Sequence, residues 1–115
     1  MTTYSYTNCV GEKIKVKLGK TSYRNNDTLA VLLLQVLDNG EEEDYGVLTV
    51  NISDSDILAD DTQAFIDTNN MGEEIINWLV KNKIAMKTPF IGRSGFCTYP
   101  LMSFTKEALA NMVAL

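Results

Sequence analysis

The chain has 115 residues, of which 45% are hydrophobic and 22% are charged. This length and mixture argue against a disordered chain and predict a single globular domain over residues 1–115. There is no histidine and there are only two cysteines, which excludes histidine-based catalysis and zinc sites built from histidine or from four thiolates. We therefore expect no enzymatic activity, no cofactor and no metal.

The apolar stretches of the chain are short. The longest, residues 29–34, could not span a bilayer, and the first residues are polar, unlike the core of a signal peptide. We expect a cytoplasmic protein that does not contact a membrane. In that compartment the two cysteines, Cys9 and Cys97, are expected to be reduced thiols.

The first half of the chain predicts β-structure. Lysine and apolar residues alternate over residues 13–18, which is typical of a half-buried strand, and residues 19–27 predict a turn or loop. Residues 29–37 are apolar almost throughout and fit a buried strand or a short helix. The signal that follows favours the strand: Asn39-Gly40 predicts a type I′ hairpin turn with two positive φ angles, and residues 45–52 return as a β-rich segment.

Helix and strand signals alternate after residue 52. Residues 53–56 predict the capped start of a helical turn, and residues 64–67 predict a short extended piece. Asn70, with Glu73 three residues later, predicts the N-cap of a helix that runs to about residue 82. Its expected apolar face is formed by Ile75, Ile76, Leu79 and Val80.

The C-terminal part predicts two further β-rich segments and a closing helix. The segments cover residues 85–91 and 96–104, with a turn over residues 92–95. Thr105 predicts the N-cap of the last helix, whose apolar stripe is expected to be Leu109, Met112 and Val113. The sum is an α+β fold: a mostly antiparallel sheet with one or two helices packed on one face.

The formal net charge of −5 is unevenly distributed along the chain. Residues 25–74 contain 13 of the 15 acidic residues and none of the ten basic ones. The densest group is Glu41-Glu42-Glu43-Asp44, close to Asp38 at the predicted turn. Along a returning strand these carboxylates would lie close together, with a repulsion of about 1 kcal/mol per close pair in water.

Two interpretations of this acidic group remain open. The carboxylates either keep a hairpin soluble or form a surface that binds a basic partner, because acidic side chains along a strand imitate the phosphates that nucleic-acid-binding proteins recognise. The same charge argues against direct binding of DNA or RNA. The candidate partner-binding residues are Asp38, Glu41, Glu42, Glu43, Asp44, Asp60 and Asp61.

Two other motifs have structural explanations. The acidic residues at 54, 56, 60 and 61 suggest a calcium loop, but Ala59 stands where an EF-hand requires glycine, so helix capping is the favoured interpretation. Gly92-Arg93-Ser94-Gly95 matches neither a nucleophile elbow nor a phosphate-binding loop and predicts a turn.

Three segments together resemble a known family. They are Leu48-Thr49-Val50-Asn51, Ala64-Phe65-Ile66-Asp67-Thr68-Asn69-Asn70 and Ser94-Gly95-Phe96-Cys97-Thr98-Tyr99-Pro100-Leu101. The family is a small bacterial one, catalogued as a domain of unknown function, with members in phages, conjugative elements and gut bacteria. The resemblance covers about residues 29–106. It implies a setting among accessory genes of mobile elements, where inhibitors of host defence, including anti-CRISPR proteins, are common, and it carries no established active site.

From the residues and the resemblance we expect a non-enzymatic acidic binding module. Its partner would be a basic, nucleic-acid-handling host-defence protein, such as a CRISPR effector, which it inhibits by nucleic-acid mimicry. The alternative is a small structural or regulatory accessory protein without an inhibitory role, for example a homodimer joined through an edge strand.

Overall fold

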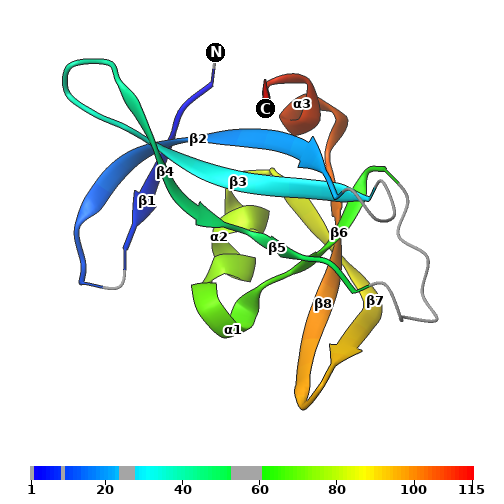
Figure 1. Cartoon of the computed structure of the whole chain (residues 1–115). Helices are drawn as coiled ribbons and strands as arrows, with labels where there is room; N and C mark the ends of the chain where they lie inside the picture. The colour runs from blue at the N-terminus through cyan, green and yellow to red at the C-terminus, as the bar shows by residue number, and fades with distance from the viewer. Residues whose placement is uncertain (1, 9, 24–27, 53–60) are drawn as a thin grey trace.

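The computed structural model describes residues 2–8, 10–23, 28–52 and 61–115. Over these residues the chain forms two β-sheets and three short helices (Figure 1). The α+β class and the predominance of antiparallel pairing are as predicted. The sequence predicts one sheet, whereas the strands divide between two.

The first sheet is built from the N-terminal half of the chain and has the strand order β1-β2-β3-β4. Its strands are β1 (Tyr4–Thr7), β2 (Lys13–Ser22), β3 (Leu29–Val36) and β4 (Glu42–Val47). The strands predicted at 13–18 and 29–37 are confirmed. The loop predicted to start at residue 19 is wrong in its first part, because β2 continues to Ser22 and pairs with β3 along the whole apolar segment.

The second sheet has the strand order β5-β6-β8-β7. Its strands are β5 (Thr49–Val50), β6 (Gln63–Ile66), β7 (Ala85–Ser94) and β8 (Cys97–Phe104). In Figure 1, β2 and β3 run across the view, whereas β7 and β8 run down it and end in a hairpin at the bottom. Helices α1 (Thr68–Met71) and α2 (Glu74–Lys81) lie below β2 and β3, and α3 (Lys106–Ala110) lies apart from them near the C-terminus.

One hydrophobic cluster joins the two sheets and the helices. In β2 and β3 the alternate residues Val16, Leu18, Val31 and Leu33 point into it, so Lys13, Lys15 and Lys17 of β2 face outward. The other sheet, α2 and α3 contribute buried residues that include Ala64, Ile66, Met102, Phe104, Ile75, Leu79 and Ala108. The predicted face of the helix is therefore confirmed at Ile75 and Leu79 and partly at Ile76, whereas Val80 is exposed.

Leu48 connects the sheets, because it is the single residue between β4 in one and β5 in the other. Its N–H donates to the Val31 carbonyl oxygen of the first sheet at 2.9 Å, and its own carbonyl oxygen accepts from the Asp67 N–H, just after β6, at 2.8 Å. The Thr49 hydroxyl oxygen accepts from the Val31 N–H at 3.2 Å. One strand thus passes from sheet to sheet with its backbone groups paired, and the Leu48 side chain is fully buried.

The helix predicted from Asn70 to about residue 82 is instead two helices. The Asp67 side chain caps α1, accepting hydrogen bonds from the Asn70 backbone N–H at 3.2 Å and from its side-chain amide at 2.7 Å. Gly72, with φ of 81°, then ends α1 before α2 begins at Glu74. The expected N-cap at Asn70 is therefore wrong. The N-cap of α1 lies three residues earlier, at Asp67, whose buried carboxylate accepts the otherwise free backbone N–H of Asn70.

The last helix begins as predicted and ends earlier. The Thr105 side-chain oxygen accepts from the Ala108 N–H at 3.1 Å, which confirms the N-cap. Met112 is buried, but Val113 belongs to β9 (Val113–Ala114), which pairs in parallel with β2 at Gly19 and Lys20. The chain thus closes by adding a strand to the first sheet.

The two hairpin turns differ from the expected types. At Asn39-Gly40 only Gly40 has a positive φ, and the Leu37–Glu41 and Gly40–Leu37 hydrogen bonds define a three-residue loop with glycine in the left-handed region. The turn between β7 and β8 is Gly95-Phe96 rather than residues 92–95, because Ser94 pairs with Cys97. The helical turn predicted at 53–56 lies outside the described residues.

Gly92 supports the close packing of the second sheet. A Cβ atom at this position would lie 2.6 Å from Phe65 Cε1 and 2.9 Å from Ile52 Cδ1. We predict that Gly92→Ala lowers the free energy of unfolding by about 1–3 kcal/mol through overpacking. Gly46→Ala is the matched control, because its Cβ would meet only Met71 Sδ at an ordinary 3.5 Å. Denaturant unfolding of the two variants measures the difference, and equal stabilities would contradict the packing argument.

A half-buried tyrosine, Tyr23, lies beside the crossing at Leu48. The hydroxyl groups of Tyr23 and Thr49 share a hydrogen bond of 2.9 Å. Burial raises the pKa of Tyr23 above its usual value; the Asp67 carboxylate adds to this rise, and the hydrogen bond to Thr49 opposes it. Burial also raises the pKa of Tyr4 and of Tyr99.

These three raised values predict a loss of stability in alkali. A tyrosine whose pKa is higher in the folded than in the unfolded protein stabilises the fold fully below the unfolded value of about 10, and this contribution disappears as the pH rises through the folded pKa. The free energy of unfolding should therefore fall above about pH 10, and Tyr23→Phe should make that fall shallower. Chemical unfolding at several pH values from 8 to 11.5 measures both, and an identical pH dependence in the variant would contradict the assignment to Tyr23.

Candidate functional site

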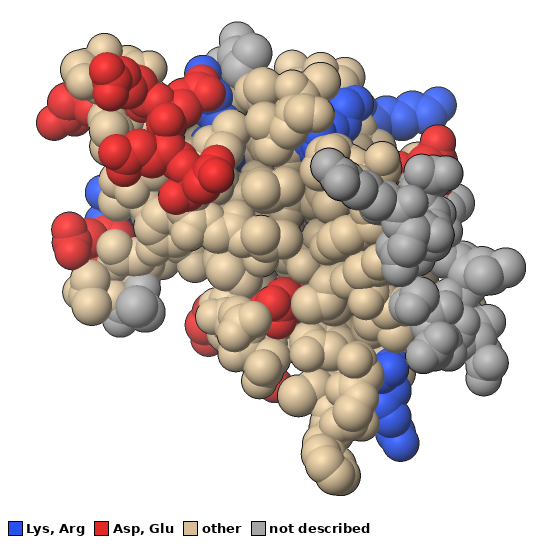
Figure 2. Space-filling model, in the orientation of Figure 1, with Lys and Arg blue, Asp and Glu red and all other residues tan. Residues whose placement is uncertain are grey.

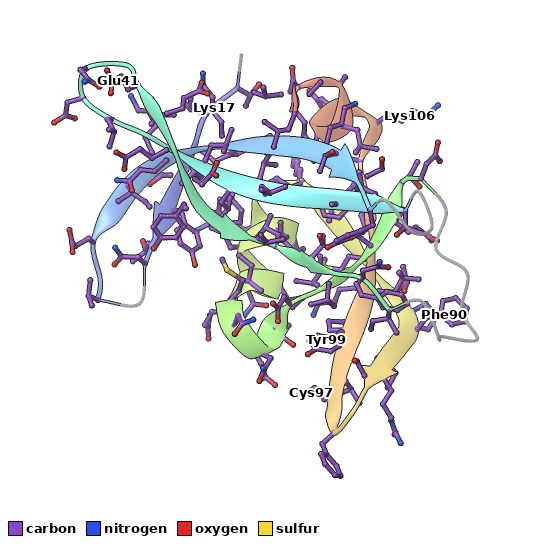
Figure 3. All side chains as sticks on the ribbon, viewed as in Figure 1. Lys17, Glu41, Phe90, Cys97, Tyr99 and Lys106 are labelled. Atoms are coloured by element: carbon purple, nitrogen blue, oxygen red, sulfur yellow. The ribbon has the colours of Figure 1, made fainter. Side chains whose placement is uncertain are left out.

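The structure brings five of the seven candidate acidic residues together on the β3–β4 hairpin. Asp38 lies in its turn, Glu41 follows the turn, and Glu42, Glu43 and Asp44 begin β4 opposite Val36, Gln35 and Leu34. All five are exposed. Figure 2 shows their carboxylates gathered at one corner of the molecule, and Figure 3 places Glu41 at the tip. We call these five residues the acidic hairpin surface.

A β-bulge at Tyr45 determines which way these side chains point. Leu33 pairs with Gly46 and Leu34 with Asp44, so Tyr45 is the extra residue of β4. Leu33 faces the core, and Leu34 therefore lies on the outer face of the sheet. Asp44, its register partner, shares that outer face, as does Glu42 two residues away, whereas Glu43 points to the opposite side.

One of the five carboxylates has a cationic partner. The Lys17 ammonium of β2 reaches across β3 to Glu42 Oε1. Leu34, which lies between Lys17 and Asp44 in register, is buried although it faces away from the core. Within the part of the chain that the structure describes, the other four acidic side chains of the surface have no lysine or arginine within 4.0 Å. The surface therefore retains most of its negative charge.

An aromatic cluster holds the base of the hairpin in place. Tyr45 of β4 packs edge-to-face against Tyr6 of β1 at 5.9 Å, and Tyr6 packs in the same way against Trp78 of α2 at 5.2 Å between ring centroids. The Trp78 indole N–H donates to the Ser5 carbonyl oxygen at 2.8 Å. This chain of contacts fixes β4 to β1 and α2, so the acidic residues project from a supported strand.

Asp61, a sixth candidate residue, does not join this surface. Asp61 is exposed and precedes β6 by two residues, and β6 begins on the opposite side of Figure 1 from the β3–β4 turn. Asp60 lies outside the described residues. Of the six candidate residues that the structure describes, five therefore form one acidic surface.

A second hairpin, β7–β8, carries exposed apolar residues within the segments that the sequence predicts only as β-rich. Phe90 and Ile91 of β7 are 51% and 55% exposed, and Phe96 in the turn is fully exposed. The missed signal is Gly95, whose φ of 61° starts a two-residue turn and so places the next residue at the tip. Lys87 and Arg93 are the charged residues of this hairpin, and both are exposed.

A comparison with models of protein families finds a match for the chain. A family model described as a domain of unknown function, DUF4313, matches residues 17–114. The chain belongs to the DUF4313 family. The match includes both hairpins and both sheets except β1 and the first residues of β2. No curated protein and no solved structure matches the chain.

The acidic residues also occupy the edge of a sheet in this DUF4313 protein, because β4 has a neighbour on one side only. Charged side chains and bulges keep exposed edges from pairing with other strands. Edge protection is therefore a second role that the same residues can have. It does not require five carboxylates, since a single charge and the bulge at Tyr45 already interrupt the edge.

Two further features bear on metal binding and thiol chemistry. No group of three or more cysteine, aspartate or glutamate side chains in the described ranges is arranged to hold a metal ion. Cys97 is a half-buried free thiol, and its hydrogen bond with Tyr99, after burial, contributes to the raised pKa of that tyrosine. Cys9 lies outside the described residues. No helix in the described part of the chain is long and apolar enough to cross a membrane.

Charge crowding predicts that the acidic hairpin surface costs stability. The test variant combines four substitutions: Asp38→Asn, Glu41→Gln, Glu43→Gln and Asp44→Asn. In 20 mM salt its free energy of unfolding should rise by about 0.5–1.5 kcal/mol, because repulsion between neighbouring carboxylates is removed. In 0.5 M salt the rise should be close to zero, because the repulsion is already screened. Glu42→Gln should act in the opposite direction, by less than about 1 kcal/mol, because it breaks the partly exposed pair with Lys17. Urea unfolding at the two salt concentrations measures both, and a destabilised combined variant would contradict the prediction.

Proposed function

We propose that this DUF4313 protein is a non-enzymatic binding module whose acidic hairpin surface binds a basic surface of a partner protein. The observation that carries the proposal is the exposure of five carboxylates on one supported hairpin, with only Glu42 paired to a lysine among the described residues. Such a surface raises the association rate with a positively charged partner and opposes association with another acidic one.

The arrangement favours a partner whose natural ligand is nucleic acid. Glu42 and Asp44 lie on the same side of β4, about 7 Å apart along the strand, and Glu41, Glu43 and Asp38 extend the negative charge to the tip and the opposite side. A strand that displays carboxylates in this way offers acceptors to arginine and lysine side chains that otherwise bind phosphates. Bound in such a groove, the hairpin would exclude the nucleic acid.

The resemblance to proteins of phages and conjugative elements supports a narrower form of the proposal. In that setting the partner is a basic, nucleic-acid-handling protein of host defence, such as a CRISPR effector, and the chain is its inhibitor in the cytoplasm. The protein itself does not bind DNA or RNA through the acidic hairpin surface, because phosphates are repelled there.

The test compares two variants that lose the same number of charges. The first neutralises Asp38, Glu41, Glu43 and Asp44; the control neutralises Glu12, Asp61, Glu73 and Glu74, which are exposed and lie outside the hairpin. Each protein is immobilised and used to capture proteins from a nuclease-treated bacterial extract at 50 and 500 mM salt. We expect the parent and the control to retain the same basic protein at low salt, and the hairpin variant to lose at least tenfold in binding.

The captured protein is then used to test whether the chain competes with nucleic acid. Its binding to nucleic acid, measured by fluorescence anisotropy, should fall as the parent chain is added and should be unaffected by the hairpin variant. If the hairpin variant binds and competes as well as the parent, the proposal is wrong. If the hairpin variant instead forms dimers or aggregates and the parent captures no basic protein, the carboxylates serve edge protection.

A further inference from the structure

The β7–β8 hairpin combines a bulge in β7 with exposed apolar side chains. Between the Lys87–Met102 and Ile91–Pro100 pairs, three residues of β7 face the single residue Leu101. Within this bulge the Thr88 hydroxyl donates to the Leu101 carbonyl oxygen at 2.7 Å and accepts from the Phe90 N–H at 3.2 Å. The backbone is thus satisfied while the side chains of Phe90 and Ile91 remain more than half exposed.

The charge of this hairpin is opposite to that of the acidic hairpin surface. The chain has no acidic residue between Glu74 and Glu107, so Lys87 and Arg93 stand beside the exposed apolar residues without a carboxylate on the same hairpin. At the β3–β4 hairpin the relation is reversed: four carboxylates, which have no cationic partner among the described residues, lie beside Tyr45 and Val47, which are partly exposed. Each hairpin therefore offers apolar area with a charged rim that complements the other.

The two hairpins of one molecule do not meet. In Figure 1 the β3–β4 turn is at the upper left and the β7–β8 turn is at the bottom, with both sheets between them, and the molecule measures 44 Å along its longest axis. The complementary contact is therefore available only between two copies. It is heterologous, since each copy uses a different surface, and it leaves one free hairpin of each kind.

We propose that the β7–β8 hairpin of one DUF4313 chain binds the acidic hairpin surface of a second copy, with Phe96 and Ile91 against its apolar residues and Arg93 against its carboxylates. This inference rests on the proposed function, because self-association and partner binding both use the acidic hairpin surface. Self-association would regulate how much of that surface is free. A partner protein and a second copy compete for the same carboxylates. At high concentration, self-association therefore covers the acidic hairpin surface, and binding to the partner dissociates the copies.

The contact between two hairpin ends is small, so the association is expected to be weak, with a Kd on the order of 0.1 mM. Each copy carries a net charge of −5, and this long-range repulsion is screened beyond about 10 Å in 0.1 M salt while closer pairs still attract. Sedimentation velocity from 10 µM to 1 mM in 0.1 M salt should show a mass that rises beyond that of a dimer, and less association in 0.5 M salt.

Two variants separate the two halves of the contact. The acidic variant loses carboxylates of the acidic hairpin surface through Asp38→Asn, Glu41→Gln, Glu43→Gln and Asp44→Asn. The apolar variant loses contacts of the β7–β8 hairpin through Arg93→Glu and Phe96→Ser, at two exposed positions that do not support the core. Each alone should remain monomeric to 1 mM, because each lacks one half. Mixed in equal amounts they should form a dimer and nothing larger, because each supplies the half that the other lacks. The control Lys106→Glu, Val10→Ser removes one cation and one exposed apolar residue elsewhere and should associate like the parent.

The outcomes distinguish this inference from the proposed function. A parent chain that stays monomeric to 1 mM, or a mixture of variants that stays monomeric, overturns the inference, and binding of the parent to its basic partner then stands unaffected. Parent dimers that persist in both variants overturn it in favour of another interface. Binding of the parent, but not of the apolar variant, to single-stranded oligonucleotides or to anionic phosphatidylserine vesicles, without self-association, overturns it in favour of that ligand.

Discussion

The peptide groups around Leu48 bond to two sheets at once, and the rest of the architecture depends on that. The Leu48 N–H is paired with Val31 in the first sheet and its carbonyl oxygen with Asp67 at the end of β6, while the Thr49 side chain replaces the missing ladder partner of Val31. Because a buried backbone group without a partner costs about 1–3 kcal/mol, a strand can leave one sheet for another only where such substitutes exist. The shared core forms between the sheets that this crossing holds together.

The crossing also determines where the acidic residues lie. β4 is the part of the continuous strand that precedes Leu48, and it is an edge of the first sheet. The bulge at Tyr45 and the contacts of that ring with Tyr6 hold it in register. The carboxylates thus lie on a strand that the contact between Tyr45 and Tyr6 holds in place. Their mutual repulsion acts on residues that do not belong to the hydrophobic core.

The sheet edges at β1, β5, β7 and β4 are protected in different ways, and β9 completes the β1 edge by pairing with β2 at Gly19 and Lys20. β1 is covered by Trp78, whose indole N–H occupies the Ser5 carbonyl oxygen, and β5 is only two residues long. β7 is interrupted by a bulge that contains Pro89, and β4 is lined with carboxylates. Each device discourages continuous strand pairing. The proposed contacts with other proteins accordingly use side chains at the hairpin ends, where charge and exposed apolar residues are concentrated.

The sequence alone was sufficient for local features. Strict alternation over residues 13–18, the apolar run of β3, the Asn39-Gly40 turn and the Thr105 cap all correspond to observed elements, because strand periodicity, turn glycine and helix capping depend on neighbouring residues. The acidic hairpin surface was also predictable, since four consecutive acidic residues after a turn must follow one strand. The type of that turn was not, because Leu37 and Glu41 set the loop at three residues.

Tertiary structure decided the features that depend on residues far apart in the chain. The division into two sheets rests on hydrogen bonds from Leu48 to Val31 and Asp67, and no local pattern marks that crossing. The split of the predicted helix depends on a buried Asp67 that caps from an earlier position. The Lys17–Glu42 pair, the separation of Asp61 from the hairpin and the exposure of Phe96 at the opposite end likewise follow from strand register and sheet order. The sequence therefore determined which residues carry charge and which form strands, and only the fold decided which of them meet, because strand pairing joins segments whose separation along the chain leaves no periodic trace.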